Sequence, residues 1–220
     1  IYFFIMRALI TGGSGGIGKS ICDIFKDNGV EVVNPTRKEL DLSNPNSLNK
    51  YLDSINDLHI IVNNAGVNNL TYIDNTTLKD LNNTFNVNFF SPYLITSHFL
   101  DKFRNQGIVN VSSVLGSYSK TSRSTYSSSK AALHSLTKSI VSETKGFNIL
   151  TNTISPGYIA TDLTTKNNTP QVLTKIINSI PTNKLGEPSE IAKWVYNLTI
   201  GNNYINGQEI IIDGGLTCTI

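Results

Sequence analysis

RALITGGSGGIG, residues 7–18, decides the fold of this chain. Residues 7–11 have the length and apolar character of a buried strand, and a glycine-rich turn leads from them into a helical pattern. Gly12, Gly16 and Gly18 permit a tight turn and a close approach of a ligand to the backbone. A strand, a glycine turn and a helix in this order place N–H groups and a helix N-terminus where a pyrophosphate can bind. We therefore predict a dinucleotide-binding unit here.

The same residues also fit a different site. Gly12, Ser14 and Gly16 match G-x-S-x-G, the nucleophile elbow of α/β-hydrolases, which also lies between a strand and a helix. An elbow requires an earlier strand and loop that contribute to the oxyanion hole, and only eleven residues precede Gly12. Position in the chain therefore favours dinucleotide binding.

The second strand, residues 30–36 (VEVVNPT), indicates which dinucleotide is bound. Many NAD binders carry an acidic residue at the end of this strand, where it accepts hydrogen bonds from the ribose hydroxyls. Here Thr36 takes that place and Arg37 and Lys38 follow. Because a guanidinium presents a planar fork to phosphate oxygens, Arg37 favours the 2′-phosphate of NADP(H), with NAD left open.

A strand over residues 39–42 (ELDL) would follow at once, with no room for a helix before it. The sequence therefore predicts a shortened connection between the second and third strands and a reduced edge of the sheet. Asp41 and Leu42 are placed to flank the adenine, although Asp41 also fits the cap of a helix.

The rest of the chain alternates short apolar runs with helical patterns, which predicts a single-domain, Rossmann-type, doubly wound parallel sheet over residues 6–220, with helices on both faces. The expected strands are residues 59–62, 108–111, 149–155 and 208–212. A helix over 77–103 should kink at Pro92. A last helix covers 188–198, and a looser segment, 162–181, fits a mobile substrate lid.

Tyr126 and Lys130 stand four residues apart in TSRSTYSSSKAAL, residues 121–133. On a helix this spacing brings a phenol and an ammonium onto one face. A nearby cation favours the phenolate and lowers the tyrosine pKa from about 10, so the pair is suited to proton transfer. By itself, a solvated helix face explains the same spacing.

Composition excludes several classes of protein. The chain has 220 residues, 15% of them charged, and a formal net charge of +2, which fits neither a disordered chain nor a strongly basic nucleic-acid binder. No apolar run has the length of a membrane span, and the apolar residues 1–5 are too short for a signal peptide, so Met6 is a candidate start.

Cysteine and histidine usage points to the cytoplasm and gives no metal site. Cys22 and Cys218 lie far apart without a C-x-x-C partner, which fits free thiols in a reducing compartment. The histidines, His59, His98 and His134, lack the spacing of metal ligands.

Together, six short motifs resemble those of the short-chain dehydrogenase/reductase family. They are TGGSGGIG (11–18), NNAG (63–66), VN (87–88), VSS (111–113), YSSSK (126–130) and PGYIAT (156–161). LGEPSEIA (185–192) and GQEIIIDGG (207–215) also resemble the 3-oxoacyl-[acyl-carrier protein] reductase branch. Each motif is weak alone, but their order and spacing are specific.

The resemblance implies hydride transfer between NADP(H) and a carbonyl or secondary alcohol. It makes Tyr126 the general acid/base and Ser113 the residue that orients the carbonyl. Lys130 would lower the phenol pKa and hold the nicotinamide ribose, and Asn88 would anchor a water in the proton relay. A 3-oxoacyl thioester is one substrate class. A sugar or another small polar ketone is an alternative, as is a sensor or scaffold that binds NADP(H) without turnover.

Three further expectations follow from the resemblance. The helix of Tyr126 and the helix over 77–103 would pair across the axis of a homodimer or homotetramer. Gly15 stands where many NADP-specific members have a basic residue, which weakens the choice of NADP(H). The expected cofactor contacts are Gly12, Ser14, Gly16, Ile17, Gly18, Arg37, Asp41, Leu42, Asn63, Ala65, Gly66, Tyr126, Lys130, Pro156, Gly157, Ile159 and Thr161.

Overall fold

The computed structural model describes residues 6–101, 106–166 and 168–219. Within them, six strands form one parallel sheet in the order β2-β1-β3-β4-β5-β6. The strands are β1 (Arg7–Ile10), β2 (Glu31–Val33), β3 (Ile60–Asn63), β4 (Gln106–Val111), β5 (Ile149–Pro156) and β6 (Glu209–Ile212). From β1 the chain adds β2 on one side, and it then crosses back past β1 to place β3 on the other side. This reversal of the direction of winding confirms the predicted doubly wound sheet.

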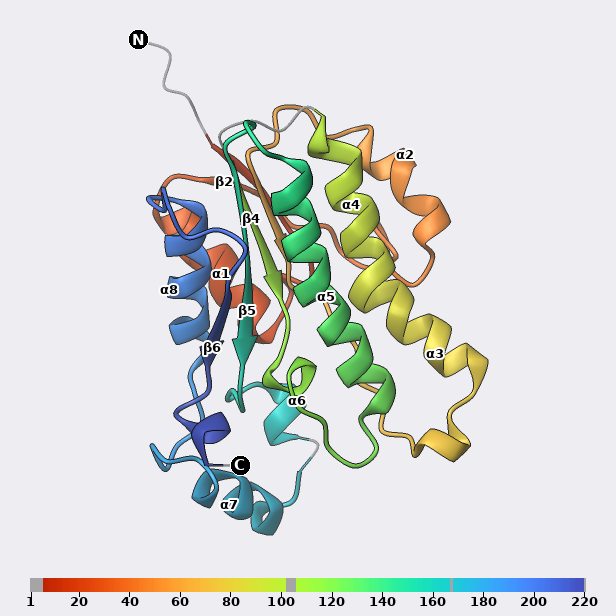
Figure 1. Ribbon diagram of the computed structural model, residues 1–220, viewed down its shortest axis with the longest axis vertical. Coiled ribbons are helices and arrows are strands. Elements are labelled where there is room, and N and C mark those ends of the chain that lie inside the picture. The colour runs from red at the N-terminus through yellow and green to blue at the C-terminus, as the bar shows by residue number, and fades with distance from the viewer. Residues whose placement is uncertain (1–5, 102–105, 167, 220) are drawn as a thin grey trace.

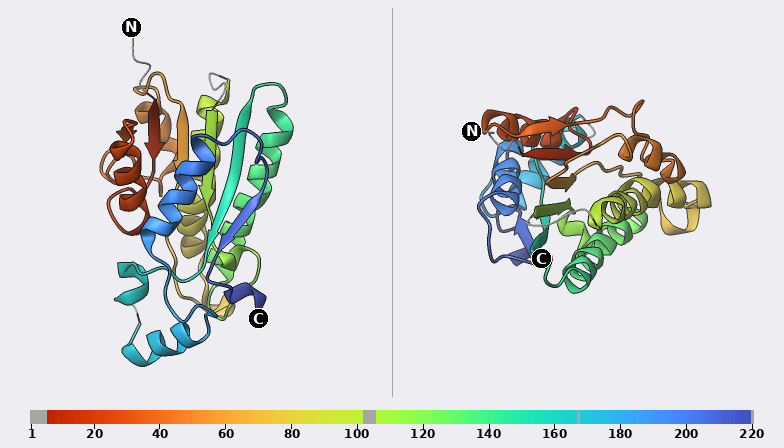
Figure 2. Two further views of the ribbon diagram at one scale, coloured as in Figure 1. Left: turned by 90° about the vertical axis from the view of Figure 1, so that its left-hand side faces the viewer. Right: turned by 90° about the horizontal axis from the view of Figure 1, so that it is seen from above.

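Helices cover both faces of the sheet (Figures 1 and 2). They are α1 (Gly16–Asp27), α2 (Leu48–Leu52), α3 (Leu78–Phe85), α4 (Ser91–Leu100), α5 (Ser124–Glu143), α6 (Asp162–Thr165), α7 (Pro170–Asn178) and α8 (Pro188–Thr199). Successive strand residues point to opposite faces. Accordingly, Ala8 and Ile10 of β1 pack with the residues of α1 and α8, whereas Leu9 packs with those of α2, α4 and α5.

The predicted strand over residues 39–42 is wrong, because this segment folds as a turn. The carbonyl of Thr36 accepts hydrogen bonds from the N–H groups of Glu39 (3.1 Å) and Leu40 (3.0 Å). The Glu39 carboxylate in turn accepts from the Thr36 N–H and hydroxyl, both at 2.8 Å. These local bonds replace strand pairing, so the three-residue β2 ends the described sheet at this side. The predicted reduction of this edge is therefore confirmed.

The long helix predicted over residues 77–103 consists of α3, a π-helical segment (Asn86–Phe90) and α4. Residues 102 and 103 lie outside the described residues. Pro92 has no N–H to donate to the carbonyl of Asn88, four residues earlier. The Ser91 N–H instead donates to the carbonyl of Asn86, five residues earlier. The irregularity therefore precedes Pro92 and includes Asn88.

The segment expected to be loose, residues 162–181, contains helices α6 and α7. The Thr169 side chain caps α7 by accepting a hydrogen bond from the Val172 N–H, and Pro170 occupies its first turn. Ile176 and Ile180 pack with Leu216 in a small separate cluster. This cluster holds the end of α7 against the chain, and α6 and α7 lie beside the carboxyl ends of the strands (Figure 1), so a substrate lid at this place stays a prediction.

Candidate active site

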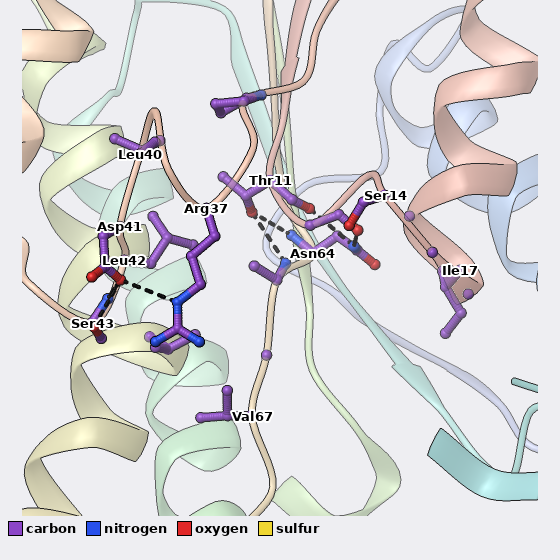
Figure 3. A pocket seen from close by; sticks show the side chains of 18 of the residues that line it. Thr11, Ser14, Ile17, Arg37, Leu40, Asp41, Leu42, Ser43, Asn64 and Val67 are labelled. Carbon is purple, nitrogen blue, oxygen red and sulfur yellow. Dashed lines mark hydrogen bonds and ion pairs between the residues drawn. The ribbon is translucent and has the colours of Figure 1, made fainter. Parts of the chain in front are cut away.

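Thr11 and Asn64 fasten the glycine turn to the end of strand β3. The Thr11 hydroxyl oxygen accepts hydrogen bonds from the N–H groups of Asn64 and Ala65, both at 3.1 Å. The Asn64 side chain donates to the carbonyls of Thr11 (3.0 Å) and Gly12 (3.2 Å). Figure 3 shows these two side chains facing each other. The turn is thereby held at the carboxyl edge of the sheet, where ligands bind in doubly wound folds.

A cavity of about 540 Å³ lies between this turn and residues 35–43. Helix α1 begins at Gly16 in its wall, so unpaired N–H groups and the positive end of a helix dipole face the space. The predicted cofactor residues that line it are Gly12, Ser14, Gly16, Ile17, Gly18, Arg37, Asp41, Leu42, Ala65, Gly66 and Thr161. This cavity is suited to the phosphates of a dinucleotide.

Arg37 provides positive charge at the far side of this cavity. Its side chain is 81% exposed and its Nε lies 3.7 Å from the Asp41 carboxylate. The hydroxyl and N–H of Ser43 donate to the same carboxylate at 2.7 and 3.0 Å and lower the pKa of Asp41. Asp41 thus stays ionised and restrains Arg37. Figure 3 shows the ion pair between the two side chains.

A smaller cavity of about 160 Å³ continues from the first. The two share Ile17, Asn64, Gly66, Val67 and Thr161 in their walls. Of the predicted site residues, the smaller cavity is lined by Ile17, Gly66, Ser113, Tyr126, Lys130, Pro156, Gly157, Ile159 and Thr161. The structure therefore joins the predicted dinucleotide site with Ser113, Tyr126 and Lys130 in one cleft, whereas Asn88, the fourth predicted catalytic residue, lines neither cavity.

Lys130 is buried, with 3% of its surface exposed. Its Nζ donates a 2.7 Å hydrogen bond to the carbonyl of Val111 and lies 5.8 Å from the centre of the Tyr126 ring. No carboxylate of the described residues forms an ion pair with it. Because burial disfavours the charged form, the pKa of Lys130 falls to about 8.

The predicted lowering of the Tyr126 pKa by Lys130 is wrong for this structure. Burial raises the pKa of Tyr126, while a hydrogen bond with the Ser113 side chain and the charge of Arg123 oppose that rise. Lys130 is not among the groups that stabilise the phenolate, since its hydrogen bond goes to Val111. Tyr126 is therefore protonated near neutral pH and paired with Ser113.

Asn88 is fully buried and its side chain fixes the loop after β3. Its Oδ1 accepts from the Val67 N–H, and its Nδ2 donates to the Val67 carbonyl, both at 2.9 Å. Nδ2 also donates to the Ser129 hydroxyl at 3.0 Å. The loop is thereby joined to helix α5 one residue before Lys130. These hydrogen bonds account for the burial of the Asn88 side chain without the water that the resemblance assigns to it, and the anchoring of a water by Asn88 stays a prediction.

Asn63, predicted as a cofactor residue, lies beneath the cleft and not in its wall. Its Nδ2 donates to Asn110 Oδ1 at 2.8 Å, and Asn110 donates to the Thr137 hydroxyl at 2.9 Å. Asn63 therefore ties β3 to β4. The neighbouring Asn64 faces the cleft, and the alternation of side chains along a strand is the signal that separates the two.

Sequence reasoning missed several residues of the wall. They are Pro35, Leu40, Ser43, Asn64, Val67, Asn83, Val87 and Asp162 in the larger cavity and Asn68, Ser112 and Thr164 in the smaller one. Most lie in turns or on helices that reach the cleft through tertiary packing. Asn64, Val87 and Ser112 fall within the motifs NNAG, VN and VSS, whereas no local pattern in the sequence marks the others.

Comparison with known proteins identifies the family. Residues 34–217 match the family model described as enoyl-(acyl carrier protein) reductase. Acetoacetyl-CoA reductase of Cupriavidus necator is 31% identical over 95% of this chain and 97% of its own length. The chain belongs to the short-chain dehydrogenase/reductase family. It resembles the 3-oxoacyl-[acyl-carrier-protein] reductase branch, and FabG of Aquifex aeolicus is 33% identical over 94% of this chain and 86% of its own length.

Solved structures of this family share the fold. ElxO with NADP bound is 26% identical, with a TM-score of 0.87 over 98% of this chain and all of that one. A 4-hydroxyisoleucine dehydrogenase complexed with NADH is 25% identical, with a TM-score of 0.87 over 97% of this chain and 99% of that one. The protein is thus an NAD(P)-dependent oxidoreductase of the short-chain type.

In the described part of the chain, no group of three or more His, Cys, Asp or Glu side chains is placed to hold a metal ion. None of its helices is long and apolar enough to cross a membrane.

The low pKa of Lys130 predicts a stability change at alkaline pH. The group has a pKa of about 8 in the folded chain and 10.5 as its ordinary value. Between these values the unfolded chain binds the extra proton, so the free energy of unfolding rises with pH, by up to about 3 kcal/mol. Urea unfolding of the cofactor-free protein from pH 7.5 to 10.5 measures this rise.

Lys130→Met is expected to abolish that rise, whereas Lys145→Met, at an exposed lysine, is expected to keep it. Burial raises the pKa of Tyr126, so this phenol lowers the free energy of unfolding from about pH 10 upward, opposite in sign to the rise from Lys130. Parallel pH profiles for the native protein and Lys130→Met would contradict the prediction.

Proposed function

We propose that this enzyme reduces a ketone with NADPH, with Tyr126 as the general acid. The observation that carries the proposal is that the Tyr126 phenol and the Ser113 hydroxyl line one cavity that is continuous with the dinucleotide cleft. A general acid must lie within hydrogen-bond reach of the atom it protonates. A carbonyl oxygen placed between these two hydroxyl groups would meet that condition.

The cleft fits a nicotinamide cofactor because it keeps space free beside the catalytic residues. A Cβ added at Gly66 would lie 3.4 Å from Lys130 Nζ and 3.5 Å from Asn88 Oδ1. Gly16 has a φ of +53°, which favours glycine at the start of helix α1. Gly12, Ser14, Gly16 and Gly18 would hold the pyrophosphate, and Lys130 the nicotinamide ribose. When bound, the cofactor supplies the hydride.

The protein's own part in the reaction is to polarise the carbonyl and deliver a proton. Ser113 would donate a hydrogen bond to the substrate oxygen, which orients the carbonyl and stabilises the developing negative charge. Tyr126 would then give its proton to that oxygen. Because burial keeps the phenol protonated near neutral pH, the site is prepared for reduction. Lys130, with its pKa of about 8, is suited to pass a proton back toward Tyr126.

The resemblance to acetoacetyl-CoA and 3-oxoacyl-[acyl-carrier-protein] reductases supports a 3-oxoacyl compound as substrate. A small polar ketone is the second candidate. It is favoured by the polar side chains of Asn68, which lines the smaller cavity with Tyr126, and of Arg123, which donates a hydrogen bond to Asn68, as described below.

Replacing Tyr126 with Phe tests the mechanism. Loss of a general acid is expected to lower kcat by about 10²- to 10⁴-fold while the Kd for NADPH stays within about twofold. Oxidation of NADPH with a panel of ketones measures kcat, and fluorescence titration measures Kd. Tyr204→Phe, at a tyrosine that is 92% exposed, is the matched control and is expected to behave as the native protein.

Unchanged turnover in Tyr126→Phe would contradict the proposed mechanism. Tight NADPH binding by a native protein that reduces no member of the panel would instead favour a sensor or scaffold.

The proposed choice of NADPH over NADH rests on the far end of the larger cavity. Arg37 lies there, held by Asp41, and Glu39 is engaged by Thr36, so its carboxylate is turned away from a ribose. The complex of ElxO with NADP supports the choice, whereas the complex of 4-hydroxyisoleucine dehydrogenase with NADH shows that the fold accepts either cofactor.

Arg37→Ala is expected to raise the Kd for NADPH by about 3- to 10-fold, because it removes a charge-assisted contact with the 2′-phosphate. The Kd for NADH is expected to stay unchanged. Lys38→Ala removes the neighbouring cation, which is exposed and outside the cavity wall. This variant is expected to change neither the Kd for NADPH nor the Kd for NADH. Equal weakening of both cofactors by Arg37→Ala would argue against a 2′-phosphate contact.

We also propose a cytoplasmic homodimer or homotetramer. Helices α3 and α4 and the segment between them expose large apolar side chains, namely Leu78, Leu81, Phe90, Tyr93 and Leu94. Contiguous apolar surface of this kind is typical of an interface between subunits. The two free cysteines fit a reducing compartment.

Sedimentation at micromolar concentration is expected to show at least a dimer. Leu94→Glu is expected to shift the protein toward the monomer, since a charge would be buried in the interface. Trp194→Glu changes an exposed aromatic residue on α8 and tests whether the subunits meet at α8 instead. This variant is expected to sediment as the native protein does. A native protein that sediments as a monomer would rule out this assembly.

A further inference from the structure

A four-residue turn before helix α5 carries two cationic side chains, those of Lys120 and Arg123. The carbonyl of Lys120 accepts a 3.1 Å hydrogen bond from the Arg123 N–H, which closes a four-residue turn. Ser122 within it has a φ of +62°, a conformation that serine adopts at a cost. The Ser122 carbonyl also accepts from the Thr71 N–H at 3.3 Å. The turn is therefore held against the loop that follows β3.

Arg123 extends from this turn to the wall of the cavity. Its guanidinium donates a 3.0 Å hydrogen bond to the Asn68 side-chain oxygen. Asn68 and Tyr126 both line the smaller cavity. Burial lowers the pKa of Arg123, whereas the phenols of Tyr158 and Tyr126 oppose that change, so the cation lies near both.

Lys120 joins the same group of side chains through Tyr158. Its Nζ donates to the Tyr158 hydroxyl at 3.1 Å and lies 5.7 Å from the centre of that ring. Tyr158 follows directly after Pro156 and Gly157, which line the cavity. Lys120 is thereby linked to the segment that continues from the cavity wall, whereas Arg123 reaches that wall through its hydrogen bond to Asn68.

Neither cation has an acidic partner among the described residues. Asp213, which acts on nearby Tyr118, uses its carboxylate to accept from the N–H groups of Gly215 and Thr217 at 2.9 and 2.7 Å. Two like charges at the ends of one turn repel each other, and a partly buried guanidinium without a counter-ion loses solvation. A bound anion would offset the repulsion between the two cations and would replace the solvation that the guanidinium has lost.

We propose that Arg123, assisted by Lys120, binds an anionic group of the substrate, so that the enzyme acts on ketones that carry a carboxylate or a phosphate. This inference rests on the proposed reduction at Tyr126 and names the substrate class of that site. A guanidinium offers several N–H donors in a plane, of which one is used by Asn68, and the others suit the oxygens of either anion.

Matched pairs of ketones test the proposal. Acetoacetate is compared with methyl acetoacetate, and dihydroxyacetone phosphate with dihydroxyacetone, each with NADPH. The native enzyme is expected to have a kcat/KM at least about 10-fold higher for the anionic member of one pair, which also tells a carboxylate from a phosphate. Arg123→Met is expected to reduce that ratio to about 1.

Three further variants separate binding from a role in holding the loop. Asn68→Ala breaks the same hydrogen bond but keeps the cation, so the preference for the anion is expected to remain. Arg123→Lys is expected to keep part of the preference for the anionic ketone, because the positive charge remains although the planar set of guanidinium donors is lost. Lys145→Met, which removes a distant exposed cation, is expected to change nothing. Equal loss of preference in Asn68→Ala and Arg123→Met would overturn the proposal in favour of a purely structural role.

The failure of this proposal differs from the failure of the proposed reduction. Turnover with a ratio near 1 or in favour of the neutral ketones would overturn the anion site while leaving the reduction intact. If no ketone is reduced, binding of 3-hydroxybutyrate and of glycerol 3-phosphate to the NADPH complex is measured by thermal shift. Stabilisation of the native protein but not of Arg123→Met by either compound would support the site. If neither compound stabilises the native protein, the site is overturned.

Discussion

The close approach of helix α5 to the end of strand β4 is the constraint on which the site depends. A Cβ added at Gly116 would lie 3.0 Å from the backbone carbonyl carbon of Lys130 and 2.9 Å from the ring of His134, so only glycine leaves room for the helix. Two hydrogen bonds hold the contact: Lys130 Nζ donates to the Val111 carbonyl, and the Ser112 hydroxyl donates to the Lys130 carbonyl at 2.9 Å. Through these bonds the residues after β4 and those on α5 keep one geometry. A displaced helix would separate Tyr126 from Ser113 even if both side chains were intact.

That geometry requires polar groups in the interior, and each is stabilised by hydrogen bonds. An ammonium without a carboxylate is costly to bury, yet among the described residues Lys130 forms no ion pair and donates its hydrogen bond to a carbonyl, and its low pKa expresses that cost. Behind it, His134 Nε2 lies 2.8 Å from the Ser112 hydroxyl. Because that hydroxyl already donates to Lys130, the ring nitrogen must carry the proton in this contact. Glu209 lies 3.4 Å from the other ring nitrogen and accepts from Ser155 at 2.7 Å, so α5 is also linked to β5 and β6.

The sequence predicted the sheet, its order of strands and helices, and most of the cleft, because these follow from local patterns. Alternating apolar residues, the glycine turn and the four-residue spacing of Tyr126 and Lys130 act within one element or at one junction. The errors arose where tertiary contacts decide. Residues 39–42 alternate like a strand, but hydrogen bonds between Thr36 and Glu39 close a turn. The pKa of Tyr126 depends on how deeply α5 is buried and on where the Lys130 ammonium points, and spacing alone gives neither.

The π-helical segment Asn86–Phe90 contains the equivalent of one extra residue between α3 and α4. Each residue of an α-helix rotates the chain by about 100°. Removal of one residue from this segment would therefore turn α3 relative to α4 and move Asn88 away from Val67 and Ser129, with which it now bonds. A relative with a gap at this point would have lost the support of the loop after β3 although every catalytic side chain still matched.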